Sequence, residues 1–228
     1  MIDKTDNIYY KLTDHESYTR REEPGETLWT PGVEHVARGE GVELCTSAVI
    51  HAYRHPLLAA FLNPIHIVLK SPLLWEALGG PVVADDGLQI GVKRLTAMCK
   101  LTVPVFTIEQ LTTAAIRIAL ELTGWWCGKK SFAAWAAGWI SGKDRSAARA
   151  ADVASVTAYL SAAEIYWQAA WAARAAQAAA QAAAEVAAAA VWAARAAAWA
   201  AWAARVTVDF PVFTSALVKI LEEVYAGK

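Results

Sequence analysis

Short apolar runs, separated by polar clusters that contain proline or glycine, characterise the first hundred residues. Runs of this length that are rich in β-branched and aromatic residues predict strands. Pro56 at the start of an apolar run predicts a short helix over residues 56–62. Asp85-Asp86-Gly87 predicts a hairpin turn between two of the strands. The predicted strands are residues 8–12, 42–45, 48–53, 65–69, 82–83 and 88–92, with 42–45 paired to 48–53.

After Pro104 the spacing of apolar residues becomes helical. Thr107 and Gln110 have the spacing of a capping box, which predicts a helix from residue 107 to about 123. Further helices are predicted over 131–140, from a cap at Asp144 or Ser146 onward, and over 211–226. A continuous helix over 145–205 would be roughly 90 Å long at 1.5 Å per residue. We therefore expect a break, at the β-branched and polar stretch 153–161.

Proline and glycine mark a boundary between two parts of the chain. Seven of the eight prolines lie at or before Pro104, and no glycine occurs between Gly142 and Gly227. The predicted fold class is α+β. A small, mostly antiparallel domain over residues 1–106 is followed by an Ala/Trp-rich helical bundle with one long helix over residues 107–228.

The composition and charge argue against two classes of protein, those that bind long nucleic acids and those that span a membrane. Hydrophobic residues make up 56% of the chain, but 33 of the 64 positions from 143 to 206 are alanine. The net charge of −1 predicts no binding of long nucleic acids. No uncharged run is long enough to span a membrane, and the first residues have no apolar signal core. Together with three scattered cysteines, these features predict a cytoplasmic protein.

Tryptophan and charged residues form one stripe along the alanine-rich region. Trp171-Ala-Ala-Arg174 recurs 21 residues later as Trp192-Ala-Ala-Arg195. Nine large residues fall on only two positions of a seven-residue repeat and so form one stripe. They are Trp167, Trp171, Arg174, Gln181, Glu185, Trp192, Arg195, Trp199 and Trp202. Such a stripe is typical of a helix–helix or subunit seam, which predicts a homo-oligomer. Alternatively, tryptophan stacks planar rings and arginine binds phosphate, which predicts a nucleotide-binding groove.

Aromatic residues and histidines of the first domain are candidates for a ligand pocket. The candidate ligand-binding residues are Tyr10, Trp29, His35, Tyr53 and His66, with Trp171, Arg174, Trp192, Arg195, Trp199 and Trp202 from the stripe. No catalytic residue, metal ligand or cofactor is predicted. His51 and His55 are four positions apart, but Pro56 ends any helix that could present both to a metal. A nucleophile formed by Cys45 with His51 or His66 has no local signature to support it.

Several short segments in residues 8–104 resemble an uncharacterised domain of tailed-phage and prophage genes. They are Tyr10-Lys11-Leu12-Thr13-Asp14, Leu62-Asn63-Pro64-Ile65-His66, Leu74-Trp75-Glu76-Ala77 and Asp86-Gly87-Leu88-Gln89-Ile90-Gly91-Val92-Lys93. Residues 139–145 and the alanine tract resemble, more loosely, Ala-rich helical proteins of the bacterial immunity type. The resemblance implies a phage-like context and carries no catalytic residues.

These observations favour a non-enzymatic phage protein that acts in the bacterial host cytoplasm. We expect it to counter host defence by binding, and so sequestering, a small nucleotide signal. One alternative is a helical module for protein interaction or oligomerisation. The other is an enzyme that processes NAD or a nucleotide through the N-terminal domain.

Overall fold

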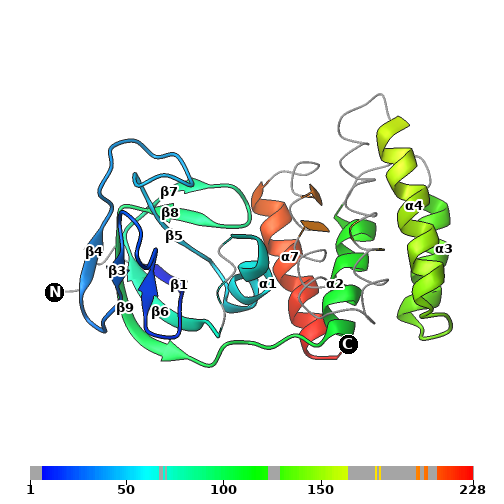
Figure 1. Ribbon diagram of the computed structural model, residues 1–228, viewed down its shortest axis with the longest axis horizontal. Coiled ribbons are helices and arrows are strands. Elements are labelled where there is room, and N and C mark those ends of the chain that lie inside the picture. Colours follow the sequence, from blue (N-terminus) through cyan, green and yellow to red (C-terminus); the bar gives the residue numbers. More distant parts are fainter. Residues whose placement is uncertain are drawn as a thin grey trace. The chain divides into compact units, whose positions relative to one another are not determined.

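The computed structural model describes residues 7–66, 69, 71–122, 129–163, 178, 180, 199–200, 203–204 and 210–227 (Figure 1). The chain divides into two compact units, Met1–Val105 and Phe106–Lys228, called here the N-terminal and C-terminal units. Antiparallel sheets lie in the first and helices dominate the second. The fold class is therefore α+β, as the sequence predicts.

The strands of the N-terminal unit form three antiparallel sheets. The four-stranded sheet has the order β1-β6-β9-β4, the three-stranded sheet β5-β8-β7, and β2 pairs with β3. The strands are β1 Asn7–Thr13, β2 Tyr18–Thr19, β3 Thr27–Leu28, β4 Glu34–Val36, β5 Ile50–Ala52, β6 Leu73–Gly79, β7 Val82–Asp85, β8 Ile90–Val92 and β9 Arg94–Leu101. Helix α1, Pro56–His66, follows β5.

Strand β1 connects the two larger sheets. Its whole length pairs with β6, and Tyr10 also forms a bridge to Tyr53 just after β5. The Tyr10 N–H donates to the Tyr53 carbonyl at 2.9 Å, and the Tyr53 N–H donates back at 2.8 Å. Because side chains alternate along a strand, Tyr9, Lys11 and Thr13 lie on the same face of β1. All three are buried.

The core of this unit collects side chains from both larger sheets. Trp75 on β6 is 1% exposed, and its indole N–H donates to the Thr13 hydroxyl at 3.1 Å, so this buried donor is satisfied. The core cluster comprises Tyr9, Trp29, Ala52, Trp75, Ala77, Ile90, Val92, Leu95 and Ala97. Burial of these aromatic and aliphatic groups provides the main driving force for the fold.

The hairpin predicted around Asp85-Asp86-Gly87 is confirmed. It joins β7 to β8, and Gly87 adopts a φ of +82°, a conformation that suits glycine. One carboxylate oxygen of Asp86 accepts from the N–H groups of Leu88 and Gln89. The two aspartates therefore build a turn.

Two strand predictions in this unit are wrong. Residues 42–45 form no strand; Cys45 has a φ of +62° in a turn, and β5 pairs with β8 instead. Ile65 and His66 belong to helix α1, which continues past the predicted residue 62. Beyond the helix, the Asn63 side chain donates to and accepts from the Leu69 backbone, both at 3.1 Å. Residues 67 and 68 of this predicted strand lie outside the described residues.

The C-terminal unit contains helices α2 Ile108–Glu121, α3 Lys129–Ile140, α4 Ala147–Ala163 and α7 Phe210–Tyr225. The starts of all four helices, and the ends of α2, α3 and α7, agree with the predictions to within a few residues. Most of the predicted continuation of α4 toward residue 205 lies outside the described residues. The break predicted within residues 153–161 is absent, because α4 runs through them uninterrupted. Thr157 is accommodated by donating its hydroxyl to the Val153 carbonyl one turn earlier, at 2.8 Å. No helix in the described part of the chain is long and apolar enough to cross a membrane.

Helices α2 and α7 are joined by polar contacts at their exposed edges and by apolar packing. The Gln110 amide donates to the Val224 and Tyr225 carbonyls at the end of α7, both at 3.2 Å. Arg117 pairs with Glu223 at 2.7 Å, and Phe213 is fully buried. The start of α2 therefore lies beside the end of α7.

The Thr107→Ala substitution is expected to lower the free energy of unfolding by about 1 kcal/mol, because it removes the capping box of α2. The Gln110 N–H donates to the Thr107 hydroxyl at 3.1 Å, and the Thr107 N–H donates to the Gln110 side-chain carbonyl at 2.8 Å. Urea unfolding monitored by circular dichroism measures the change. Thr107→Ser keeps the hydroxyl and is the control; equal loss in both variants would contradict the capping role.

Candidate functional site

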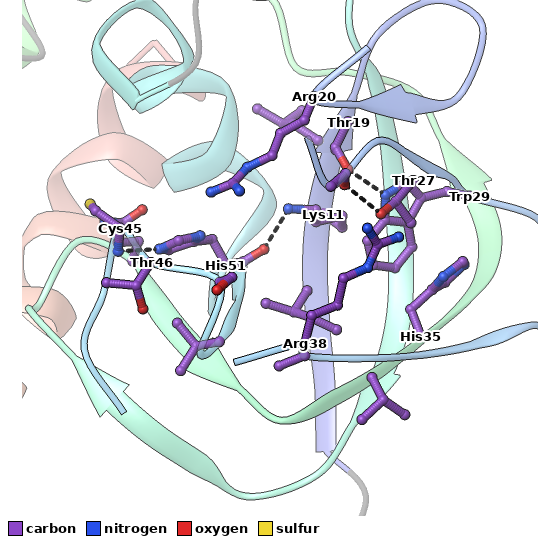
Figure 2. Close-up of a pocket in the computed structure, with 18 of the residues that line it drawn as sticks. Lys11, Thr19, Arg20, Thr27, Trp29, His35, Arg38, Cys45, Thr46 and His51 are labelled. Carbon is purple, nitrogen blue, oxygen red and sulfur yellow. Dashed lines mark hydrogen bonds between the residues drawn. The ribbon is translucent and has the colours of Figure 1, made fainter. Parts of the chain in front are cut away.

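A cavity of about 520 Å³ lies in the N-terminal unit (Figure 2). This volume is within the range of small-molecule sites. The cavity is bordered by β1, the β2–β3 hairpin, β4 with the segment that follows it, and β5. Its charged and polar lining residues are Lys11, Thr19, Arg20, Thr27, His35, Arg38, Thr46, Ser47, His51 and Gln89. Among the described residues, no aspartate or glutamate lines it.

Lys11 extends from β1 into this cavity. The residue is only 9% exposed, and its ammonium donates to the His51 carbonyl on β5 at 2.7 Å. The same group lies 5.5 Å from the centre of the Trp29 ring, close enough for a cation–π contact. Burial, and then the charge of Arg20, lower the pKa of Lys11 from 10.5 to about 8. The lysine thus carries a charge at neutral pH that its surroundings disfavour.

Two arginines add positive charge to the cavity lining. Arg20 directly follows β2 and has a φ of +54°, a sparsely populated conformation for a residue other than glycine. Arg38 follows β4, and its N–H donates to the Ser47 carbonyl at 3.1 Å. Both residues are exposed. Figure 2 draws their side chains, with that of Lys11, around the same cavity.

The arginines of the N-terminal unit differ in their partners. Those that do not line the cavity all pair with carboxylates: Arg21 with Asp14 and Glu16, Arg54 with Asp85, and Arg94 with Glu34. Arg38 instead donates to a carbonyl, that of Glu26, at 3.3 Å. In the described part of the chain, no carboxylate pairs with Arg20, Arg38 or Lys11. Three positively charged side chains therefore line the cavity, and no carboxylate of the described residues pairs with them.

Three of the predicted ligand-binding residues line this cavity: Trp29, His35 and Tyr53. Trp29 is 3% exposed and Tyr53 is 6% exposed, so their ring faces are covered by protein. The rings of Trp29 and His35 are 4.4 Å apart, and the Trp29 indole N–H donates to the Thr19 hydroxyl at 2.9 Å. Burial, followed by the charge of Arg38, lowers the pKa of His35. These aromatic residues build the wall that supports Lys11.

The other predicted ligand-binding residues lie elsewhere. Tyr10 pairs with Tyr53 through the backbone, and its ring lies 6.5 Å from that of His55, outside the cavity lining. Trp199 is 45% exposed, whereas Ala200 and Ala204 are fully buried. At this point of the stripe, methyl groups are buried and the indole is half exposed. The side chain of His66 and Trp171, Arg174, Trp192, Arg195 and Trp202 lie outside the described residues, as does most of the proposed oligomer seam.

Two histidines of the N-terminal unit, His51 and His55, accept hydrogen bonds from backbone N–H groups. The Cys45 N–H donates to Nε2 of His51 at 2.7 Å, and the Leu57 N–H donates to Nδ1 of His55 at 3.3 Å. Because the Cys45 backbone engages Nε2 of His51, that nitrogen does not act as a base toward the Cys45 thiol. In the described part of the chain, no group of three or more His, Cys, Asp or Glu residues converges as a metal site.

Sequence reasoning missed Lys11, Arg20 and Arg38 as site residues. The sequence contains one signal for Lys11. Side chains two positions apart in a strand share a face, so Lys11 is expected on the same face as Tyr9 and Thr13. For the arginines, the informative property is the lack of a carboxylate partner, which depends on the fold.

No family model, curated protein or solved structure matches this chain.

Proposed function

We propose that the N-terminal unit binds a small phosphorylated ligand, foremost a nucleotide, and holds it without turning it over. The observation that carries this proposal is the group of three cations, Lys11, Arg20 and Arg38, that line one cavity and have no carboxylate partner among the described residues. A bound anion would supply the missing counter-charge. It would also offset the cost of burying the Lys11 ammonium.

The chemistry of the lining favours phosphate over a single carboxylate. A guanidinium presents a planar fork that bonds two phosphate oxygens at once, and two such groups line the cavity with one ammonium. The hydroxyls of Thr46 and Ser47 are further polar groups of the wall. A ligand with two or more negative charges matches the local charge of the three cations best.

A nucleotide combines such charges with a planar base that fits a cavity of about 520 Å³. Because Trp29 and Tyr53 are covered, we assign recognition to the phosphates rather than to stacking on these rings. Sequestration of a nucleotide signal needs affinity alone. Together with the resemblance of residues 8–104 to phage sequences, this supports a role in countering host defence within the bacterial cytoplasm.

Titration calorimetry with the full chain tests this proposal. The panel contains adenosine, AMP, ADP, ATP, ADP-ribose, cyclic dinucleotides and inorganic pyrophosphate. We expect affinity to rise with the number of phosphate charges and adenosine to give no heat. Chromatography of the recovered ligand is expected to return it unaltered. Equal binding of adenosine and ATP, or no binding by any member of the panel, would contradict the proposal.

A further inference from the structure

Two buried or part-buried lysines of the N-terminal unit hold their amino groups differently. Lys93 donates to three backbone carbonyls, those of Gly39, Gly41 and Ala48, which use all the protons of an ammonium. Lys11 donates to one protein acceptor, the His51 carbonyl. The amino group of Lys93 is thus fully engaged by protein acceptors, whereas that of Lys11 makes a single protein hydrogen bond, which a neutral amine can also donate.

The groups around Lys11 also favour a neutral amine. The side chain lies against the Trp29 ring, and the nearby charge of Arg20 repels an ammonium. No carboxylate among the described residues pairs with it. A lysine that is desolvated and next to another cation is the kind that reacts as a nucleophile.

We propose that Lys11 forms an imine with small phosphorylated aldehydes that enter this cavity. The lone pair of the neutral Nζ amine attacks the aldehyde carbon, and one Nζ proton passes to the carbonyl oxygen to give a carbinolamine. The hydroxyl then takes a proton from solvent and leaves as water while the carbon–nitrogen double bond forms, which gives a protonated imine. The reaction needs no oxidant or reductant, and water reverses it.

The residues around Lys11 suit both ends of such a ligand. Arg20 and Arg38, which pair with no carboxylate of the described residues, bind the phosphate. The protonated imine keeps one N–H, which donates to the His51 carbonyl as the ammonium does. The inference uses the cavity of the proposed function, but it requires an aldehyde rather than a nucleotide.

Pyridoxal 5′-phosphate is a suitable probe. The full-length protein is incubated with it at neutral pH, reduced with borohydride and mapped by peptide mass spectrometry. We expect Lys11 to be labelled at least about tenfold faster than Lys93 or than Lys100, an exposed lysine over the Trp75 ring. Labelling of Lys11 no faster than that of Lys100 would overturn the proposal.

Two comparisons test the assigned roles. Pyridoxal, which lacks the phosphate, is expected to label Lys11 slowly in the wild-type chain. The Arg20→Gln/Arg38→Gln variant is expected to slow labelling by the phosphate form to that same rate, with circular dichroism confirming its fold. Equal rates for the two aldehydes in the wild-type chain would contradict the phosphate role.

Nucleotide binding provides the remaining control. Labelling of Lys11 in a protein that binds no nucleotide would contradict the proposed function and leave the imine inference standing. Nucleotide binding without selective labelling of Lys11 would contradict the imine inference and leave the proposed function standing.

Discussion

Replacement of Lys11 by methionine is expected to raise the free energy of unfolding at pH 7 and to abolish anion binding. The lowered pKa, from 10.5 to about 8, corresponds to about 3 kcal/mol by which folding disfavours the ammonium, at ~1.4 kcal/mol per pKa unit. Methionine keeps an unbranched chain against Trp29 but leaves the His51 carbonyl without its donor, at a cost of about 1 kcal/mol. The expected net gain is about 1–2 kcal/mol.

The pH dependence of stability identifies the cause of this gain. Below pH 8 the ammonium is buried in the folded state, and its full cost is present. Between pH 8 and 10.5 the folded protein has released the proton while the unfolded chain still holds it, so stability rises with pH. The difference in unfolding free energy between Lys11→Met and wild type should therefore shrink over this interval. Urea unfolding at a series of pH values measures it.

Lys100→Met is the matched control, because Lys100 is exposed and does not line the cavity. Its effect on stability is expected to stay within about 0.5 kcal/mol, with anion binding unchanged. Opposite shifts of stability and binding at Lys11 alone would show that this residue is kept for its charge. A Lys11→Met protein that is less stable and still binds anions would contradict this interpretation.

The Arg20→Gln/Arg38→Gln variant is expected to weaken binding of a triphosphate by about 100-fold. Each hydrogen bond between a guanidinium and a phosphate contributes about 1.5 kcal/mol or more, which is roughly tenfold in affinity. Both side chains are exposed, so we take the lower end of that range. Because neither arginine pairs with a carboxylate among the described residues, the stability of the protein should change little.

The matched control removes two arginines that do have partners. Arg21 and Arg54 pair with carboxylates and do not line the cavity, so Arg21→Gln/Arg54→Gln is expected to leave affinity unchanged. Calorimetry at about 50 and 200 mM salt adds a second measurement, since screening weakens exposed charge pairs. The wild-type affinity should fall more steeply with salt than that of the Arg20→Gln/Arg38→Gln variant. Equal losses in the two double variants would mean that net charge, not the cavity, determines affinity.

Local sequence patterns predict those elements whose contacts are themselves local. The capping box of Thr107 and Gln110 needs only four consecutive residues, and the Asp86-Gly87 turn satisfies its own backbone. Residues 42–45 have an apolar pattern typical of a strand, yet β8 is the strand that pairs with β5. Partner choice between strands is a tertiary property, so the propensity of either segment does not predict it.

Some residues of the candidate site can be predicted from the sequence, whereas others can be found only in the folded chain. Sequence reasoning selected Trp29, His35 and Tyr53 because aromatic residues and histidine commonly line pockets, and all three line the cavity. Their burial assigns them to the wall rather than to ligand stacking. Lys11 lies on β1, Arg20 directly after β2 and Arg38 after β4, so they come from three different segments. Only the folded chain shows that they share a cavity.

The sequence by itself determined the α+β class, most helices and the concentration of alanine and tryptophan in the second half. These features follow from backbone propensity and side-chain periodicity, which act between neighbours along the chain. The tertiary structure decided which charges are neutralised. Arg54 pairs with Asp85, 31 positions away, whereas Arg20 and Arg38 pair with no carboxylate in the described part of the chain. Charge interactions depend on distance in space and on burial, so the proposed anion site can be recognised only in the fold.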